Sequence, residues 1–220
     1  MPGIDALITF AVALFFLELS PGPDMMLVIG RGIGQGRKIA LLTVVGSVFV
    51  SGAVQLALLI LGVASLLQAH PLALDALRWV GAVYLFWYGV QLLKSFHQEN
   101  YEGDMGPTVS SWSAIRDGTI NNLTNPKSFL FMFAFLPQFV DPVAGPVWLQ
   151  LLVLGSLQKF AGVFSLGSVA IASGMIGNWI NQWSSILAWQ QRFTGVVMIG
   201  LAVRLVLTGN ANASPAPRLN

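Results

Sequence analysis

Four ionisable residues lie within or directly beside long apolar stretches of this chain. They are Glu18, Asp24, Lys127 and Lys159. A charge at the depth of a lipid bilayer costs about 2.5–3.5 kcal/mol on insertion scales, so such a residue is usually paired or lines a wet cavity. Two carboxylates and two ammonium groups are suited to holding a small zwitterion: Glu18 or Asp24 would bind an ammonium group or carry a proton, and Lys127 would bind a carboxylate.

Two proline motifs interrupt the apolar stretches beside these charges. Pro21-Gly22-Pro23 follows Glu18 by about one helical turn, and Asn125-Pro126 directly precedes Lys127. Because proline removes a backbone donor and clashes with the preceding turn, each helix should stop and restart at its motif. Thr124 or Asn125 can cap the second restart, with Pro126 in the first helical position. The restarted half-helix points free N–H groups and its positive dipole end into the protein, which favours an anion.

Each of these charges also has a purely structural interpretation. Asp24 falls in the first turn of a restarted helix, where a carboxylate suits the dipole. Glu18 could form an ion pair with Lys127 or Lys159, and Lys127 could extend to the membrane surface. Lys159 is about twelve residues into its apolar stretch, roughly 18 Å along a helix, so its structural alternative is a buried pair.

The composition is that of a chain built for lipid. Hydrophobic residues make up 55% and charged residues only 9%, and the mean hydropathy is +0.72. The net charge is +2 with scattered basic residues, so the pI near 9.2 is no nucleic-acid signal. Cysteine is absent, and the two histidines, His70 and His97, are far apart in predicted loops. We therefore expect no disulfide, no cysteine- or histidine-ligated metal and no cofactor.

Six segments approach the roughly 20 apolar residues that a helix needs to cross a bilayer. They run from about Asp5 to Gly30, Ile39 to Leu67, Leu74 to Leu93, Ala114 to Phe139, Val147 to Ala172 and Phe193 to Leu207. The first is not typical of a cleaved signal peptide, because it lacks a basic start, contains Glu18 and ends in Pro-Gly-Pro. Glycines and serines on these segments, among them Gly46, Ser47, Ser51, Gly89 and Ser165, predict close helix packing. For Gln55 we expect a hydrogen bond between helices, with a contact to a bound substrate as the alternative.

The order of the segments predicts an internal duplication within one transmembrane domain, residues 1–209. Repeat one covers about 1–94, a cytoplasmic linker 95–113, and repeat two 114–209, followed by a disordered tail at 210–220. The predicted fold is an all-α integral membrane protein of six transmembrane helices, arranged as two inverted three-helix repeats, the first helix of each broken by proline. Paired broken helices in matching places indicate a transport site near the bilayer midplane.

The basic residues predict the orientation, because cytoplasmic loops are enriched in lysine and arginine. One side would carry Arg31, Arg37, Lys38, Lys94, Arg116 and Arg192, and the other Arg78, Arg204 and Arg218. Both termini are therefore expected outside the cytoplasm. Between the fifth and sixth spans, Trp179, Trp183 and the pair Ile186/Leu187 recur at helical spacing, which predicts a short interfacial helix.

Five motifs together resemble one known family. They are Ser20–Asp24, Gly32–Arg37, Trp79–Leu85, Asn122–Lys127 and Phe135–Phe139. In order and at comparable spacing over nearly the whole chain, they are similar to the lysine exporter family, in particular its homoserine/threonine and leucine exporter branch. The resemblance implies a bacterial inner-membrane exporter of amino acids or related metabolites, driven by proton antiport. Basic-amino-acid exporters that resemble this chain have an acidic residue on the second span; Val45–Val48 has none here, which argues for neutral cargo.

The motifs and the buried charges together predict the substrate-binding residues. They are Glu18, Pro21, Gly22, Pro23, Asp24, Asn122, Asn125, Pro126, Lys127 and Lys159. In the mechanism we expect, the half-helix start at Asn125 and Lys127 holds the α-carboxylate, while Glu18, with Asp24, holds the ammonium. The expected partners are an amino acid, a proton as coupling ion and the lipid bilayer; a homo-oligomer is compatible with the sequence, and no nucleic-acid partner is expected.

Two other function classes compete with a carrier. A cation channel or metal-ion translocator on the same scaffold would need a cluster of carboxylates and carbonyls, for which only Glu18 and Asp24 lie at depth. A membrane-embedded enzyme would need a catalytic motif, and the sequence has no histidine–carboxylate metal motif and no glycine-rich phosphate loop between strand and helix. We therefore expect no enzymatic activity.

Overall fold

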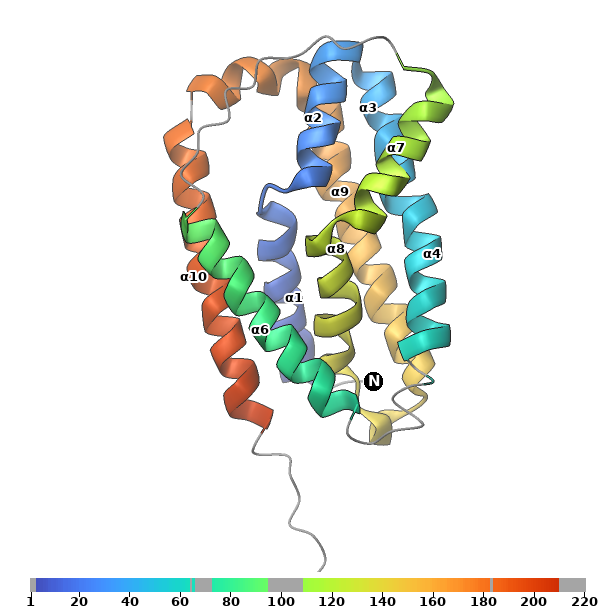
Figure 1. Ribbon diagram of the computed structural model, residues 1–220, viewed down its shortest axis with the longest axis vertical. Helices are drawn as coiled ribbons and strands as arrows, with labels where there is room; N and C mark the ends of the chain where they lie inside the picture. The colour runs from blue at the N-terminus through green and yellow to red at the C-terminus, as the bar shows by residue number, and fades with distance from the viewer. Residues whose placement is uncertain (1–2, 64, 66–72, 95–108, 183, 210–220) are drawn as a thin grey trace, which may run out of the picture.

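The computed structural model describes residues 3–63, 65, 73–94, 109–182 and 184–209, and this part of the chain contains helices and no strand (Figure 1). The α-helices are α1 (Ile4–Leu19), α2 (Pro23–Gln35), α3 (Arg37–Val44), α4 (Ser51–Leu58), α6 (Ala73–Lys94), α7 (Ser111–Thr124), α8 (Pro126–Leu130), α9 (Val147–Gln182) and α10 (Ser184–Gly209). Short π-helical segments are η1 (Val45–Val50), η2 (Leu59–Val63) and η3 (Phe131–Phe135), and 3₁₀ turns are η4 (Leu136–Phe139) and η5 (Pro142–Ala144).

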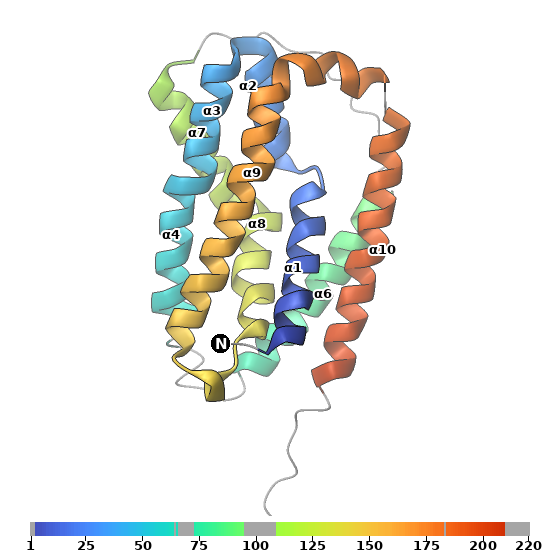
Figure 2. The same cartoon turned by 180° about the vertical axis from the view of Figure 1, so that it is seen from behind.

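The helices run up and down along the long axis of the molecule (Figures 1 and 2). From α1–α2 through α3–α4, α6, α7–α8 and α9 to α10, each unit reverses the direction of the one before it. The start of α1 and the end of α10 consequently lie at the same end of the bundle (Figure 2). The junction between α2 and α3, the start of α7 and the last turns of α9 lie at the opposite end.

Three helices are long and apolar enough to cross a membrane: Arg37–Val63, Val147–Ser173 and Trp189–Leu207. A fourth candidate is the pair α1 and α2, bent by 41° at the break between them. These match the second, fifth, sixth and first predicted spans. The predicted third and fourth spans are present as α6 and as the broken unit from α7 to η4. An all-helical membrane protein is thus confirmed, while the count of six spans stays a prediction.

The predicted interfacial helix between the fifth and sixth spans is wrong as a separate element. α9 continues without interruption from Val147 to Gln182, and α10 begins at Ser184. No proline occurs between Ala172 and Gln182, so nothing in this stretch removes a helical hydrogen bond. The final turns of α9 nevertheless lie across the end of the bundle, as an interfacial helix would (Figures 1 and 2). Trp183, residues 95–108 of the predicted 95–113 linker, the predicted tail and both histidines lie outside the described residues.

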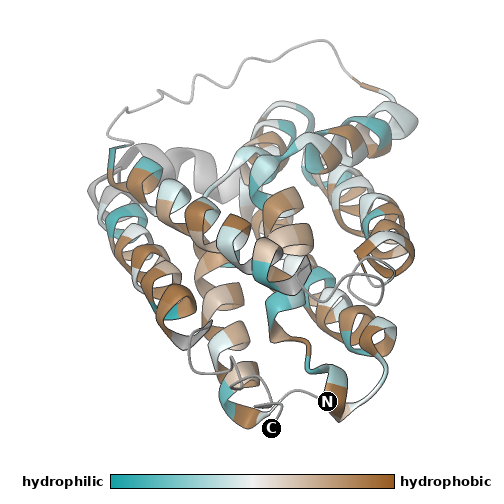
Figure 3. Cartoon of the chain, turned by 60° about the horizontal axis from the view of Figure 1, so that its bottom comes forward, coloured by the Kyte–Doolittle hydropathy of each residue, from teal (hydrophilic) through white to brown (hydrophobic). Residues whose placement is uncertain are grey.

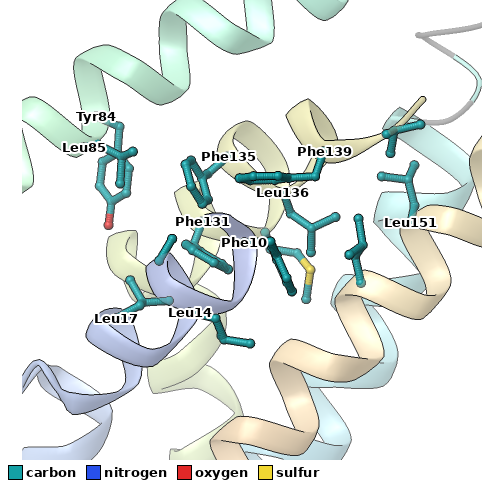
Figure 4. Close-up of a cluster of buried hydrophobic side chains, with 14 of the residues drawn as sticks. Phe10, Leu14, Leu17, Tyr84, Leu85, Phe131, Phe135, Leu136, Phe139 and Leu151 are labelled. Atoms are coloured by element: carbon teal, nitrogen blue, oxygen red, sulfur yellow. The ribbon is translucent and has the colours of Figure 1, made fainter. Parts of the chain in front are cut away.

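An aromatic and aliphatic cluster fills the half of the bundle nearer the start of α1 (Figure 4). It gathers side chains from α1, α6, η3, η4 and α9, including Phe10, Leu14, Leu17, Tyr84, Leu85, Phe131, Phe135, Leu136, Phe139 and Leu151. Phe139 packs edge-on against both Phe10 and Phe135, with ring centroids 5.4 and 4.9 Å apart. This cluster anchors the broken helices of both halves to the same core.

Hydrophobic residues occur along most of the length of the helices (Figure 3), and many large apolar side chains are exposed. Leu61, Phe160 and Phe164 are each more than 60% exposed. Bare apolar surface of this extent around the helices is what a lipid-facing bundle presents. The outer surface therefore agrees with the composition.

Glycines set the closest approaches between helices, as predicted. A Cβ atom on Gly46 would lie 2.0 Å from the backbone oxygen of Ile115, so η1 and α7 touch through their main chains. Gly89 and Gly195 make the same kind of contact between α6 and α10, each against the carbonyl oxygen of the other. These contacts hold the two halves of the chain together with no room for a larger residue.

Candidate functional site

Both predicted helix breaks are present. α1 ends at Leu19 and α2 begins at Pro23, while α7 ends at Thr124 and α8 begins at Pro126. Pro23 and Pro126 each occupy the first turn of the restarted helix, where a missing N–H is tolerated. Asn125 is the cap of α8, because its Oδ1 accepts a hydrogen bond from the Lys127 amide at 2.9 Å.

A carboxylate of the first half is bound by three amides of the second half. Asp24 Oδ1 accepts from Asn121 Nδ2 at 2.6 Å, and Asp24 Oδ2 accepts from the Nδ2 atoms of Asn122 and Asn125, both at 2.7 Å. Asp24 is 9% exposed, so these are buried, charge-assisted hydrogen bonds. They join the start of α2 to the end of α7 and to the break that follows it.

Asn122 is itself held from a third direction. Its Oδ1 accepts from Ser51 Oγ at 2.7 Å and from Ser128 Oγ at 3.3 Å. Ser51 lies on α4, so the network around Asp24 reaches from α2 through α7 to the second helix of the first half. Ser51 was predicted as a packing residue only, and its hydroxyl is used as a donor as well.

Lys127 spans from the second break to the first. Its ammonium donates to the backbone oxygen of Ser20 at 2.5 Å, and its methylene chain packs on Gly22. The Lys127 carbonyl oxygen accepts from the Tyr84 hydroxyl at 3.3 Å. Lys127 therefore points into the protein and not to the membrane surface, so the surface-seeking alternative is not what the structure shows.

Lys159 is buried on α9 and donates to Gln55 Oε1 of α4. The inter-helix hydrogen bond predicted for Gln55 is thereby confirmed. Glu18 is half-buried, and its backbone oxygen accepts from Ser165 Oγ at 3.0 Å. Within the described part of the chain, no lysine or arginine nitrogen lies within 4.0 Å of the Glu18 carboxylate. Its predicted structural alternative, a direct ion pair with Lys127 or Lys159, is not formed.

A small polar cavity lies where these groups meet. Its polar lining consists of Glu18, Asp24, Ser47, Asn122, Asn125, Lys127, Ser128, Gln158, Lys159 and Ser165. Leu17, Met25, Val48 and Leu166 supply apolar wall, and Gly22 and Gly162 complete it. The cavity volume is about 40 Å³, which holds a few water molecules. A ligand the size of an amino acid would need the lining helices to move apart.

The structure places seven of the ten residues predicted for the site in the cavity lining. Glu18, Gly22, Asp24, Asn122, Asn125, Lys127 and Lys159 line the cavity, and Pro126 starts the helix that carries Lys127. Pro21 and Pro23 shape the first break without lining the cavity. Sequence reasoning missed Asn121, Ser128 and Gln158, which lie beside predicted site residues, and treated Ser47 and Ser165 as packing residues.

A second polar contact joins the halves nearer the α2–α3 end. Arg31 Nη2 of α2 lies 2.9 Å from Asp117 Oδ2 of α7, and Ser113 Oγ donates to the same oxygen at 3.1 Å. Arg116 contacts the other oxygen of Asp117. Together with the Asp24 network, this closes α2 against α7 over several turns.

A helical bundle with an apolar exterior, two paired helix breaks and a polar cavity between them defines a multi-pass membrane protein of the kind that moves small solutes. The chain belongs to the LysE type translocator family, whose family model matches residues 15–209. The resemblance inferred from the motifs is thereby confirmed. This is a family of translocators and not of enzymes.

Individual relatives match over almost the whole chain. A leucine efflux protein of Enterobacter sp. (strain 638) is 29% identical over 197 residues, covering 90% of this chain and 93% of the relative. A leucine efflux protein of Klebsiella pneumoniae is 28% identical over 204 residues, covering 92% and 95%. An uncharacterised membrane protein of Pseudomonas aeruginosa is 30% identical over 211 residues, with the same coverage. No solved structure matches the chain with significance.

Proposed function

We propose that this protein exports amino acids or related small metabolites across the bacterial inner membrane in exchange for protons. The observation that carries the proposal is the cavity between the two helix breaks, which is lined by a carboxylate, Glu18, and by two ammonium groups, Lys127 and Lys159. Groups of both signs in one buried site suit a zwitterion. The leucine efflux proteins among the relatives support an amino acid as the cargo.

The architecture we propose is six membrane spans in two inverted repeats. The packing supports it, because the contacts are similar when the halves are exchanged. The broken unit α1–α2 packs on α9, the second helix of the other half, and the broken unit starting with α7 packs on α3 and η1 in the first half. The third helices, α6 and α10, pack on each other. Alternating helix directions, with the start of α1 and the end of α10 on one side, agree with termini on the periplasmic side, as the basic residues predict.

Neutral amino acids such as homoserine, threonine and leucine are the cargo we propose. A basic amino acid carries a second cation on its side chain, which would need a further carboxylate. The described cavity lining contains only two acids, Glu18 and Asp24, and the Asp24 oxygens already accept three amide hydrogen bonds. The second span contributes Ser47 and Val48 to the lining and no acid.

Glu18 is the group we propose for both ammonium binding and proton exchange. It lines the cavity and has no cation of the described residues within 4.0 Å. A deprotonated Glu18 attracts the substrate ammonium, and a protonated Glu18 does not. Protonation from the outside would therefore favour release there, and the deprotonated form would favour loading on the cytoplasmic side. Asp24 instead couples the two breaks, so that they move together when the cavity opens.

Counterflow in vesicles tests this proposal. Purified protein is reconstituted, the vesicles are loaded with unlabelled homoserine, threonine or leucine, and uptake of the labelled amino acid is followed. A carrier gives a transient, saturable overshoot, and an imposed proton gradient should shift its rate. Uptake without overshoot or saturation would instead favour the channel alternative, although no group of three or more potential metal ligands occurs among the described residues.

A further inference from the structure

We infer that the α-carboxylate of the substrate binds to Lys159 together with the side-chain amide of Gln55, and that Lys127 is a positioning residue for the two helix breaks. This rests on the proposed function and assigns the carboxylate end of the same site. The sequence alone favoured Lys127, because it stands at a helix N-terminus. The side-chain contacts of the two lysines reverse that preference.

The polar groups of Lys127 connect the two helix breaks. Its ammonium donates to the Ser20 backbone oxygen, and its amide donates to Asn125 Oδ1. Its methylene chain packs on Gly22, where a Cβ would come within 3.3 Å of Lys127 Cδ. The ammonium of Lys127, at the start of α8, thus donates to a backbone oxygen at the end of α1 that has no partner within its own helix. This contact holds the two breaks together.

Lys159 is more deeply buried than Lys127, at 9% exposed, and its partner is an amide that is itself not fully satisfied. Each of the two ammonium groups makes one hydrogen bond within the described part of the chain, Lys127 to the Ser20 backbone oxygen and Lys159 to Gln55 Oε1. The amide nitrogen of the same side chain, Gln55 Nε2, is also a hydrogen-bond donor. It is fully buried and has no partner among the described residues. Gly52 lies against the methylene chain of Lys159, where a Cβ would come within 3.1–3.4 Å, so this glycine leaves room for the lysine.

A buried polar group without a hydrogen-bond partner destabilises the folded protein, and a bound carboxylate would supply the acceptor that these donors lack. An unsatisfied buried donor costs about 1–3 kcal/mol, so such groups are retained where something else satisfies them during function. The Nε2 of Gln55 belongs to the same amide as the oxygen that Lys159 contacts. One carboxylate can therefore accept from both the ammonium and the amide, in the two-point manner that carboxylates favour.

The opposite end of the substrate finds acceptors in the cavity that Lys159 lines; Gln55 is not part of this lining, so a carboxylate reaches its amide only when the helices move apart. Gln158 also lines the cavity, is 5% exposed and has an Oε1 without a partner among the described residues. Together with the Glu18 carboxylate it offers two acceptors to an ammonium group. Donors at Lys159 and Gln55 Nε2, and acceptors at Gln158 Oε1 and the Glu18 carboxylate, are the complement of an α-amino acid.

The test is whether each lysine discriminates between an amino acid and its amide. Counterflow uses the one of homoserine, threonine and leucine that wild type exchanges fastest, with that amino acid and its carboxamide as competitors. Removing the carboxylate should weaken competition roughly tenfold or more in wild type, the effect of about one charge-assisted hydrogen bond. In Lys159→Met the amino acid and its amide should compete equally, with a raised KM. In Lys127→Met the maximal rate should fall while the discrimination remains.

The outcomes separate the two proposals. Discrimination kept in Lys159→Met, or lost in Lys127→Met, overturns the assignment of the carboxylate but leaves amino acid export standing. Absence of counterflow with all three amino acids in wild type overturns export itself and the assignment with it. Should Lys159→Met unfold in a thermal melt of the solubilised protein, Gln55→Leu replaces it, and discrimination must then fall because the second donor is gone.

Discussion

The Asp24 network joins the two halves of the chain, and Asp24→Asn tests it most severely. The substitution keeps the size of the side chain but removes the charge that three amides contact at 2.6–2.7 Å. An asparagine there offers one carbonyl oxygen as acceptor. Its own NH₂ group is a donor and faces at least one of the three amide donors, so no hydrogen bond forms there. We expect the start of α2 to separate from the end of α7.

The size of the effect can be worked out from the three hydrogen bonds that Asp24 accepts. Hydrogen bonds to a charged group contribute about 1.5–3 kcal/mol and neutral ones about 0.5–1.5 kcal/mol, and a buried unsatisfied donor costs about 1–3 kcal/mol. Two weakened bonds and one donor facing a donor amount to roughly 3–5 kcal/mol. Relief of the buried charge's desolvation offsets part of this, so a net loss on the order of 3 kcal/mol is expected. Chemical denaturation of the solubilised protein measures it, and counterflow should fall in parallel.

Moving the carboxylate to the partner residue tests whether the loss comes from these hydrogen bonds or from a general destabilisation of the fold. In the double variant Asp24→Asn with Asn125→Asp, the carboxylate moves to the other end of the same hydrogen bond. The cap of α8 is retained, because an aspartate oxygen can still accept from the Lys127 amide. Stability should recover at least in part.

Asp5→Asn is the matched control for this experiment. Asp5 is exposed in the first turn of α1, so the same chemical change there removes only its interaction with the helix dipole; it should cost no more than about 1 kcal/mol and leave transport unchanged. An Asp24→Asn protein as stable and active as wild type, or a double variant no better than the single one, would refute the reasoning.

The remaining predictions concern other parts of the site and its supports. Glu18→Gln should abolish counterflow while the protein still inserts into the membrane; normal exchange would remove Glu18 from the mechanism. A double-mutant cycle on Arg31→Ala and Asp117→Ala should give a coupling of about 0.5–1 kcal/mol, as for a partly exposed pair, and zero coupling would contradict a contact between α2 and α7. Gly46→Ala should cost about 1–3 kcal/mol by overpacking against α7, whereas Gly200→Ala, which meets nothing within 4 Å, should not destabilise; equal effects would contradict the packing.

The helix breaks were predictable because their cause is local. Proline at 23 and 126 dictates where a helix can restart, and Asn125 is a cap by residue type alone. The end of the fifth span was predicted from the end of the apolar stretch and not from a helix-breaking residue. No such residue occurs there, so α9 continues past the predicted end. Nothing between Ala172 and Gln182 forces the chain out of a helix.

The partners of the buried charges were not predictable, because they depend on which helices pack together. Asp24 finds its amides about 100 residues further along the chain, and Lys159 finds Gln55 at a similar separation. Sequence spacing shows that Lys127 and Lys159 are both at depth but does not show which groups each ammonium contacts. The three-dimensional contacts decide between them.

The most direct test of the central claim is whether an amino acid enters the cavity between the helix breaks. The chain has no cysteine, so a single one can be introduced without a background signal. Ser165 lines the cavity, and the neighbouring Phe164 is 61% exposed on the outer side of α9. In membranes, a small water-soluble thiol reagent should modify the Ser165→Cys variant, the transported amino acid should slow that modification, and the Phe164→Cys variant should stay unmodified. A rate for Ser165→Cys that is the same with and without the amino acid would contradict the account.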